Sequence, residues 1–205
     1  VYSMLHQLGV ISKGDIDSFR TLGSTCQGHV DMKWTDGVDF SAGSLGMGLS
    51  FGLGCALAAR MDSSERNIWV MIGDGETQEG QIWEAMMFAA HHKVDNIIAT
   101  VDWNGQQIDG SNDDVMSLGD LPAKWAAFGW EVLHADGHNI GELLEVLAKA
   151  KSLTGNGKPI VILMKTSMGK GVDFMEGTHH WHGVAPNDAQ MADALSQLPE
   201  TLGDY

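Results

Sequence analysis

The chain has 205 residues, enough to bury a substantial core, and its length predicts one domain over residues 1–205. It contains 12 Lys and Arg and 27 Asp and Glu, which gives a net charge of −15. This negative charge argues against nucleic acid or an anionic membrane surface as a partner. No window approaches about eighteen consecutive apolar residues, no signal peptide is recognisable, and two cysteines make no disulfide framework. We therefore expect a cytoplasmic protein without a membrane span.

The first part of the sequence predicts short helices and a glycine-rich run. Helices are expected over 1–8 and 15–22, with Ser12 as a plausible cap for the second. A run rich in glycine, 41–50, leads into a helix over 51–61, whose glycines and alanines should let it pack close to its neighbours. Because the chain opens inside the first helix without a cap, we expect part of the N-terminus to be missing.

From residue 68 onward, predicted strands alternate with predicted helices. The strands are short apolar runs rich in β-branched residues, at 68–72, 96–101, 130–134 and 159–164. Helical spacing of apolar residues is found at 78–92, 121–128, 140–153 and 188–198. This order predicts an α/β fold with an open, mostly parallel sheet and helices on both faces. Irregular segments are expected at 105–118 and 166–187, beyond the carboxyl ends of strands, where such sheets bind ligands.

Two oxygen-bearing side chains follow neighbouring predicted strands. Asp74 comes after the strand at 68–72 and Asn104 after the strand at 96–101, and a right-handed crossover places both strand ends at one edge of the sheet. Carboxylate and amide oxygens suit Mg²⁺, which commonly completes its shell with phosphate. Gly75 lets the backbone approach a phosphate, and the helix opening near Glu79 directs its positive end there.

Gly-Asp-Gly by itself is most often an ordinary tight turn. The conjunction of strand, GDGE, helix, second strand and Asn-Gly is what predicts a metal-diphosphate site at this edge.

Histidines are concentrated in two loops. His29 lies in a turn, and three further histidines lie at 179–182. A zinc site is the alternative for that second cluster, but it needs further ligands and the two cysteines show no suitable spacing. Imidazoles also bind phosphates and substrate hydroxyls, which fits a loop that follows the strand at 159–164.

These segments together resemble the transketolase family. The thiamine-diphosphate motif of that family is similar to GDGETQEG followed by VDWNGQQIDG. The GHP and GSLGQGL region resembles QGHVDMKWTDGVDFSAGSLGMGL, and the later histidine loop resembles MGKGVDFMEGTHHWHG. The resemblance covers nearly the whole chain and keeps the family's order.

The resemblance implies a cofactor site for thiamine diphosphate with Mg²⁺, or Ca²⁺ or Mn²⁺ in its place. Asp74, Asn104 and the backbone carbonyl of Gln106 would hold the metal. The implied cofactor-binding residues, which line the diphosphate or flank the thiazolium and aminopyrimidine rings, are Gly43, Leu45, Gly73, Asp74, Gly75, Glu76, Asn104 and His182.

Three residues carry implied catalytic roles. His29 would contact the C1 hydroxyl of the substrate, and His182 would lie near the diphosphate and the reacting substrate. Glu79 matches an acidic residue implied in communication between paired active sites.

The resemblance also implies the reaction, which is transfer of a two-carbon ketol unit from a ketose, or its phosphate, to an aldose. The glutamate that activates the cofactor in this family lies on a pyrimidine-binding domain that this sequence does not contain. We therefore expect half of a split transketolase that works with a separate C-terminal subunit, as an α2β2 assembly, in pentose phosphate and carbohydrate metabolism. The alternatives are the alpha subunit of a 2-oxo-acid dehydrogenase, a deoxyxylulose-phosphate synthase relative, or a non-catalytic scaffold.

Overall fold

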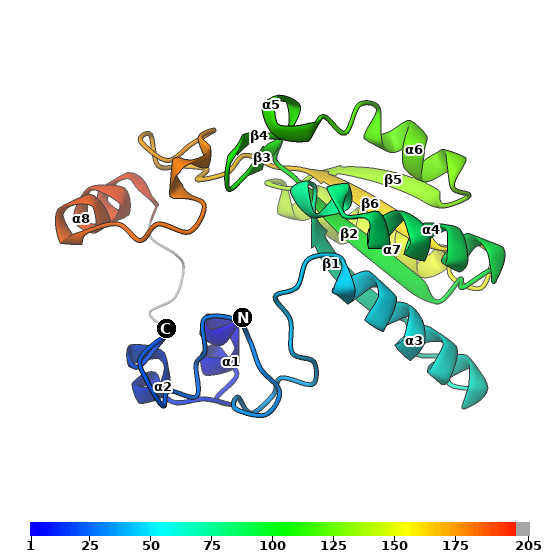
Figure 1. The fold of residues 1–205 in the computed structure, drawn as a ribbon, viewed down its shortest axis with the longest axis horizontal. Helices are drawn as coiled ribbons and strands as arrows, with labels where there is room; N and C mark the ends of the chain where they lie inside the picture. Colours follow the sequence, from blue (N-terminus) through cyan, green and yellow to red (C-terminus); the bar gives the residue numbers. More distant parts are fainter. Residues whose placement is uncertain (200–205) are drawn as a thin grey trace. The chain divides into compact units, whose positions relative to one another are not determined.

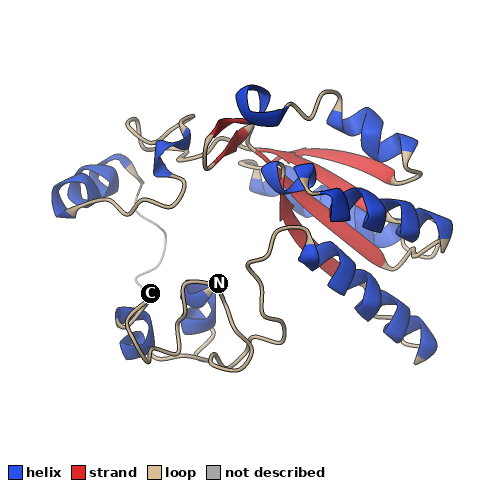
Figure 2. Cartoon of the chain, in the orientation of Figure 1, coloured by secondary structure: helices blue, strands red, loops and turns tan. Residues whose placement is uncertain are grey.

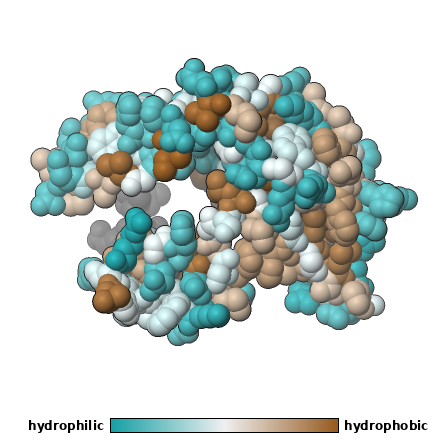
Figure 3. All heavy atoms as spheres, viewed as in Figure 1, coloured by the Kyte–Doolittle hydropathy of each residue, from teal (hydrophilic) through white to brown (hydrophobic). Residues whose placement is uncertain are grey.

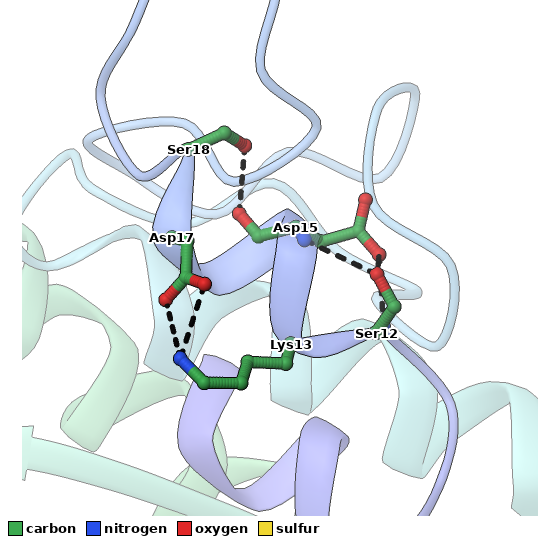
Figure 4. Close-up of polar contacts among 5 residues, drawn as sticks. All are labelled: Ser12, Lys13, Asp15, Asp17 and Ser18. Atoms are coloured by element: carbon green, nitrogen blue, oxygen red, sulfur yellow. Dashed lines mark hydrogen bonds and ion pairs between the residues drawn. The ribbon is translucent and has the colours of Figure 1, made fainter.

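The computed structural model describes residues 1–199, which divide into two compact units, residues 1–45 and the residues from Gly46 onward. The first unit contains α1 (Tyr2–Gln7) and α2 (Lys13–Asp17). Ser12 caps α2 as predicted, through the reciprocal bonds with Asp15 drawn in Figure 4.

The predicted extent of the second helix, 15–22, is wrong at both ends. The helix begins at Lys13 and stops at Asp17. Arg20 has a φ of 61° and its N–H donates to the carbonyl of Cys26 at 3.0 Å. The chain has therefore left the helical path before 22, because a left-handed residue cannot continue a right-handed helix.

The second unit is built around one parallel sheet (Figures 1 and 2). Its strands are β1 (Ile68–Gly73), β2 (Ile97–Trp103), β5 (Glu131–Asp136) and β6 (Ile160–Lys165), in the order β1-β2-β6-β5. The first two strands are adjacent, with Gly73 opposite Asp102. All four predicted strands are thus confirmed, and their carboxyl ends share one edge.

Helices cover both faces of the sheet, as predicted. On one face lie α3 (Met47–Met61), α4 (Gly80–His91) and α6 (Leu121–Ala127), and on the other lies α7 (Ile140–Leu153). Alternate strand residues serve the two cores, so Val161 belongs to the first and Ile160 to the second. A last helix, α8, spans Asp188–Gln197.

The glycine-rich helix packs closely on the sheet, as its composition predicts. A Cβ atom built on Gly52 would lie only 2.4 Å from Cγ2 of Val70 in β1. On the outer side, apolar side chains gather over the α3 and α4 part of the surface in Figure 3, with Phe51 and Phe88 44% and 42% exposed. Among the described residues no helix is long and apolar enough to cross a bilayer.

The two segments expected to be irregular contain short elements. The first holds a two-stranded hairpin, β3 (Gln106–Gln107) with β4 (Gly110–Ser111), followed by α5 (Asn112–Met116). The second holds the 3-10 turn η2 (His179–Trp181). A further 3-10 turn, η1 (Gly75–Gln78), separates β1 from α4. Such short elements lack the periodicity that identifies longer ones in a sequence.

Candidate active site

Asp74 lies at the carboxyl end of β1 and is almost completely buried, with 1% of its surface exposed. Its Oδ1 accepts the N–H of Gly75 at 2.8 Å, and its Oδ2 accepts the N–H of Gly105 at 2.6 Å. Because Gly105 directly follows Asn104, the structure brings together the two strand ends that the sequence pairs.

The surroundings of Asp74 act on its charge in opposite directions. Burial raises the pKa of Asp74, and the nearby Asp102 carboxylate adds to that rise. Hydrogen bonds from the backbone of Gly105 and Gly75 lower the pKa, as does the nearby amide of Asn112, without cancelling the effect of burial. No described residue forms an ion pair with the Asp74 carboxylate. Within the described part of the chain, no cationic side chain therefore compensates its buried negative charge.

Asn104 is oriented by a neighbouring carboxylate. Its Nδ2 donates to Oδ2 of Asp102 at 3.2 Å, and its Oδ1 accepts the N–H of Gln106 at 2.8 Å. The other oxygen of Asp102 accepts a bond from the hydroxyl of Thr166, which follows β6. The amide oxygen of Asn104 therefore has a defined direction, and one of its two lone pairs stays available to a ligand.

Sequence reasoning missed Asp102 and Thr166. The sequence could have predicted the proximity of Asp102 to Asn104, because side chains two residues apart in an extended strand lie on the same face, and Asp102 comes two residues before Asn104. Thr166 carries no such signal, since only the β2 and β6 register brings it there.

The carboxylate of Glu76 is already engaged by the backbone. Its Oε1 accepts the N–H of Gly46 at 2.8 Å and its Oε2 accepts the N–H of Gly73 at 3.1 Å. This side chain ties the start of α3 to the end of β1. Its contacts are those of a brace between two segments, and its assignment to the cofactor stays a prediction.

Gly75 lies against the hairpin that follows Asn104. A Cβ on Gly75 would come within 3.1 Å of Cβ of Gln107 and 3.5 Å of Oδ1 of Asn112. Oε1 of Gln107 and both side-chain polar atoms of Asn112 are buried without a hydrogen-bond partner among the described residues. A buried carboxylate, a directed amide oxygen and unpaired buried amides suit a hard cation with an oxygen-rich ligand. The residues present therefore fit a divalent metal with a diphosphate.

The histidine loop reaches the same end of the second unit. Thr178 caps η2 by accepting the N–H of His180, and Nε1 of Trp181 donates to the carbonyl of Phe174 at 2.9 Å. The turn η2 contacts β4, the second strand of the hairpin after Asn104. His182 follows this turn as its C-cap residue and has an exposed side chain.

Three predicted residues belong to the first unit, and their assignment to the cofactor stays a prediction. His29 is exposed, and a Cβ on Gly43 would lie 2.7 Å from its Cγ, so these two residues pack together. Leu45 is 60% exposed. Glu79, in the second unit, is the N-cap residue of α4 and is exposed, and its role also stays a prediction.

An open parallel sheet with a buried carboxylate, an amide and a glycine turn at two adjacent strand ends is the arrangement of α/β domains that bind ligands beyond the carboxyl ends of their strands. The family model described as transketolase, thiamine diphosphate binding domain, matches residues 1–201. The chain belongs to this family, and the resemblance found in its motifs is confirmed.

Two relatives with described activities match over almost the whole chain. The 6-deoxy-6-sulfo-D-fructose transketolase subunit SqwG of a Clostridium species is 40% identical over 198 residues, 97% of this chain and 71% of the relative. One subunit of the apulose-4-phosphate transketolase of Phocaeicola vulgatus is 36% identical over 202 residues, 98% of this chain and 71% of the relative.

Solved transketolase structures have the same fold. The transketolase of Campylobacter jejuni superposes with a TM-score of 0.88 at 33% identity, over 96% of this chain and 32% of that chain. The transketolase of Leishmania mexicana gives a TM-score of 0.86 at 29% identity, over 95% and 30%. The chain thus spans about a third of these longer transketolases, and both its relatives and its neighbours favour a transketolase over a 2-oxo-acid dehydrogenase subunit.

Proposed function

We propose that this chain is the thiamine-diphosphate-binding half of a split transketolase, which transfers a two-carbon ketol unit from a ketose to an aldose. The observation that carries the proposal is the buried Asp74, held by backbone amides at the end of β1 beside the loop of Asn104. Support comes from relatives that are themselves named as transketolase subunits.

The metal would be held by the residues at this sheet edge. Asp74 and Asn104 would supply side-chain oxygens and Gln106 its backbone carbonyl to Mg²⁺, Ca²⁺ or Mn²⁺. Gly73 and Gly75 would leave room for the diphosphate, because neither carries a Cβ. Glu76 would keep the start of α3 against this turn through its bonds to Gly46 and Gly73.

Bound thiamine diphosphate supplies the electron sink that carbon–carbon cleavage next to a carbonyl requires. The protein's part is to bind, orient and exclude water. His182, in the loop beside the metal residues, would donate a hydrogen bond to the diphosphate or to the substrate. His29 would bind the C1 hydroxyl of the substrate, while Gly43 and Leu45 would contact the rings of the cofactor, and Glu79 would couple paired sites.

The partner in this proposal is a separate C-terminal subunit with a pyrimidine-binding domain, joined in an α2β2 assembly in the cytoplasm. The apolar groove between α3 and α4, lined by Leu53, Leu57, Ala85 and Phe88, is in keeping with an assembling protein. The named relatives act on 6-deoxy-6-sulfo-D-fructose and apulose 4-phosphate. We accordingly propose a sugar or sugar phosphate as substrate, in carbohydrate metabolism of the pentose phosphate type.

The test is ketol transfer by the chain alone and by the chain mixed with its C-terminal subunit, with thiamine diphosphate and Mg²⁺ present. We expect activity only in the mixture, and a loss of about 100-fold or more when Asp74→Ala is used. Asp62→Ala is the matched control, since this aspartate has a side chain that is 70% exposed at the end of α3.

Each outcome bears on one part of the proposal. Ketol transfer by the chain alone would overturn the split site. Full activity of Asp74→Ala in the mixture would overturn the metal assignment, and an inactive wild-type mixture would favour a non-catalytic scaffold.

A further inference from the structure

A buried amide beside the metal residues lacks the hydrogen bonds that burial demands. Asn112 is only 5% exposed, and within residues 1–199 neither its Nδ2 nor its Oδ1 has a hydrogen-bond partner. Buried side-chain amides are nearly always paired, because desolvating them without compensation costs free energy. A residue needed only to fill this space would be apolar.

The position of Asn112 is fixed by the backbone. Its N–H donates to the carbonyl of Gly105 at 2.9 Å, which ties it to the turn after Asn104. Its Oδ1 lies 3.5 Å from where a Cβ on Gly75 would stand, and Gly105, which Asn112 contacts, donates its own N–H to Oδ2 of Asp74 at 2.6 Å. Asn112 therefore lies directly beside the Gly-Asp-Gly turn, although its contact with Asp74 falls short of a well-formed hydrogen bond.

A second unpaired group shares this environment. Oε1 of Gln107 is buried without a partner in the described part of the chain, and it lies on the same side of Gly75 as Asn112. The Asn112 amide has two protons to donate, and the carboxylate of Asp74 and this oxygen are acceptors around the same Gly75 turn. Donors and acceptors for a hydrogen-bond network are thus present around this turn, but the described residues do not form these hydrogen bonds.

Another buried amide in the same unit behaves differently. Asn96 is partly buried at the opposite end of β2. Its Oδ1 is also buried without a partner among the described residues, but its Nδ2 donates to the carbonyl of Ala56 at 2.9 Å. That bond links α3 to the strand, so its side chain has an evident role in the fold. Asn112 has no comparable bond, which separates it from a residue kept for structure.

We propose that Asn112 is a positioning residue of the metal-diphosphate site, whose amide holds the Asp74 carboxylate in the orientation that the metal requires. The inference rests on the proposed function, because it presupposes that Asp74 binds the metal. Residues that orient metal ligands act through hydrogen bonds of this kind. A buried amide without a partner in the chain itself lowers stability, and a role in orienting a metal ligand would explain why it is there.

The test compares Asn112→Leu with the wild-type chain in two measurements. Leucine has a similar shape to asparagine but cannot form hydrogen bonds. Calorimetric titration with Mn²⁺ of each chain mixed with the C-terminal subunit, at saturating thiamine diphosphate, should show about tenfold weaker binding of the metal by the variant. The urea midpoint of the metal-free chain should stay equal or rise, because an unpaired buried amide has been removed.

Asn96→Leu is the matched control. It should lower the urea midpoint, since it removes a formed hydrogen bond, and leave Mn²⁺ binding unchanged. Asn112→Ala, which adds no bulk, should also weaken Mn²⁺ binding and serves if the leucine variant does not fold.

Unchanged Mn²⁺ affinity in the folded Asn112 variants would overturn the inference while leaving the proposed function intact. A lowered urea midpoint with unchanged affinity would likewise mark Asn112 as a structural residue. Failure of the wild-type chain, mixed with its C-terminal subunit and thiamine diphosphate, to bind Mn²⁺ would overturn the metal site and this inference together.

Discussion

At the scale of single residues, Ser12 and Asp15 satisfy each other's backbone at the start of α2 (Figure 4). Oδ2 of Asp15 accepts the N–H of Ser12 at 2.8 Å and its hydroxyl at 2.6 Å. The Ser12 side chain contributes most to lowering the pKa of Asp15 below its usual 3.8, followed by the Ser12 backbone and Thr25. Because the folded pKa is lowered, this carboxylate stabilises the fold above pH 3.8 and loses that contribution as the pH falls through the folded pKa.

Replacing Ser12→Ala should therefore raise the titration midpoint of Asp15, as followed by NMR of its side-chain carboxyl carbon. Thr25→Val removes a bond of 3.0 Å to the same carboxylate and should raise the midpoint less. The advantage of the wild-type chain over Ser12→Ala in unfolding experiments should shrink as the pH drops below 3.8. An unchanged titration midpoint of Asp15 in Ser12→Ala would show that the Ser12 side chain does not stabilise the charged form of this carboxylate.

Asp74 shows how far a single position can be predicted. Its place at a strand end follows from the apolar run before it and the Gly-Asp-Gly turn around it. Its partners do not follow, because Gly105 is 31 positions away and meets the carboxylate only through the pairing of β1 with β2. For the same reason the sequence does not reveal Asn112.

At the scale of elements, the contact between α3 and β1 depends on the absence of one side chain. Gly52 is buried, and a Cβ there would lie 2.4 Å from Cγ2 of Val70, closer than atoms can approach. Helix propensity favours alanine over glycine, so packing and propensity act in opposite directions at this position. The glycine-rich composition predicted a close approach, while the particular glycine became evident only from the helix face that meets the strand.

Gly52→Ala should destabilise the chain by about 1–3 kcal/mol in urea unfolding, because the added methyl group forces α3 away from the sheet. Gly54 is the control on the same helix, since a Cβ there meets nothing within 4 Å. Gly54→Ala should stabilise the chain by up to about 1 kcal/mol. The prediction fails if both variants have the same sign of effect.

At the scale of the whole chain, the buried apolar residues are unevenly distributed. Both hydrophobic cores lie between Leu49 and Leu163. In residues 1–45 the buried apolar side chains are Ile11 and Cys26. The family model nevertheless spans residues 1–201, so both compact units belong to the family's domain. The single domain expected from length stays a prediction.

A chain beginning at Gly46 should unfold cooperatively at nearly the urea midpoint of the full chain, because it keeps both cores and the Glu76 bond to Gly46. A peptide of residues 1–45 should show little helix by circular dichroism, since so few apolar side chains cannot offset its conformational entropy. A non-cooperative transition in the chain beginning at Gly46 would contradict this prediction.

The sequence by itself determined the α/β class, the four strands, the edge where Asp74 and Asn104 meet, and the family. These follow from local periodicity, turn chemistry and motif order, which short stretches of chain carry. The tertiary structure alone decided that Thr166 and Asp102 direct Asn104, that Glu76 braces two segments, and that Asn112 lies unpaired beside Asp74. Such contacts join residues far apart in the chain, and only the register of the strands and the path of the hairpin bring them together.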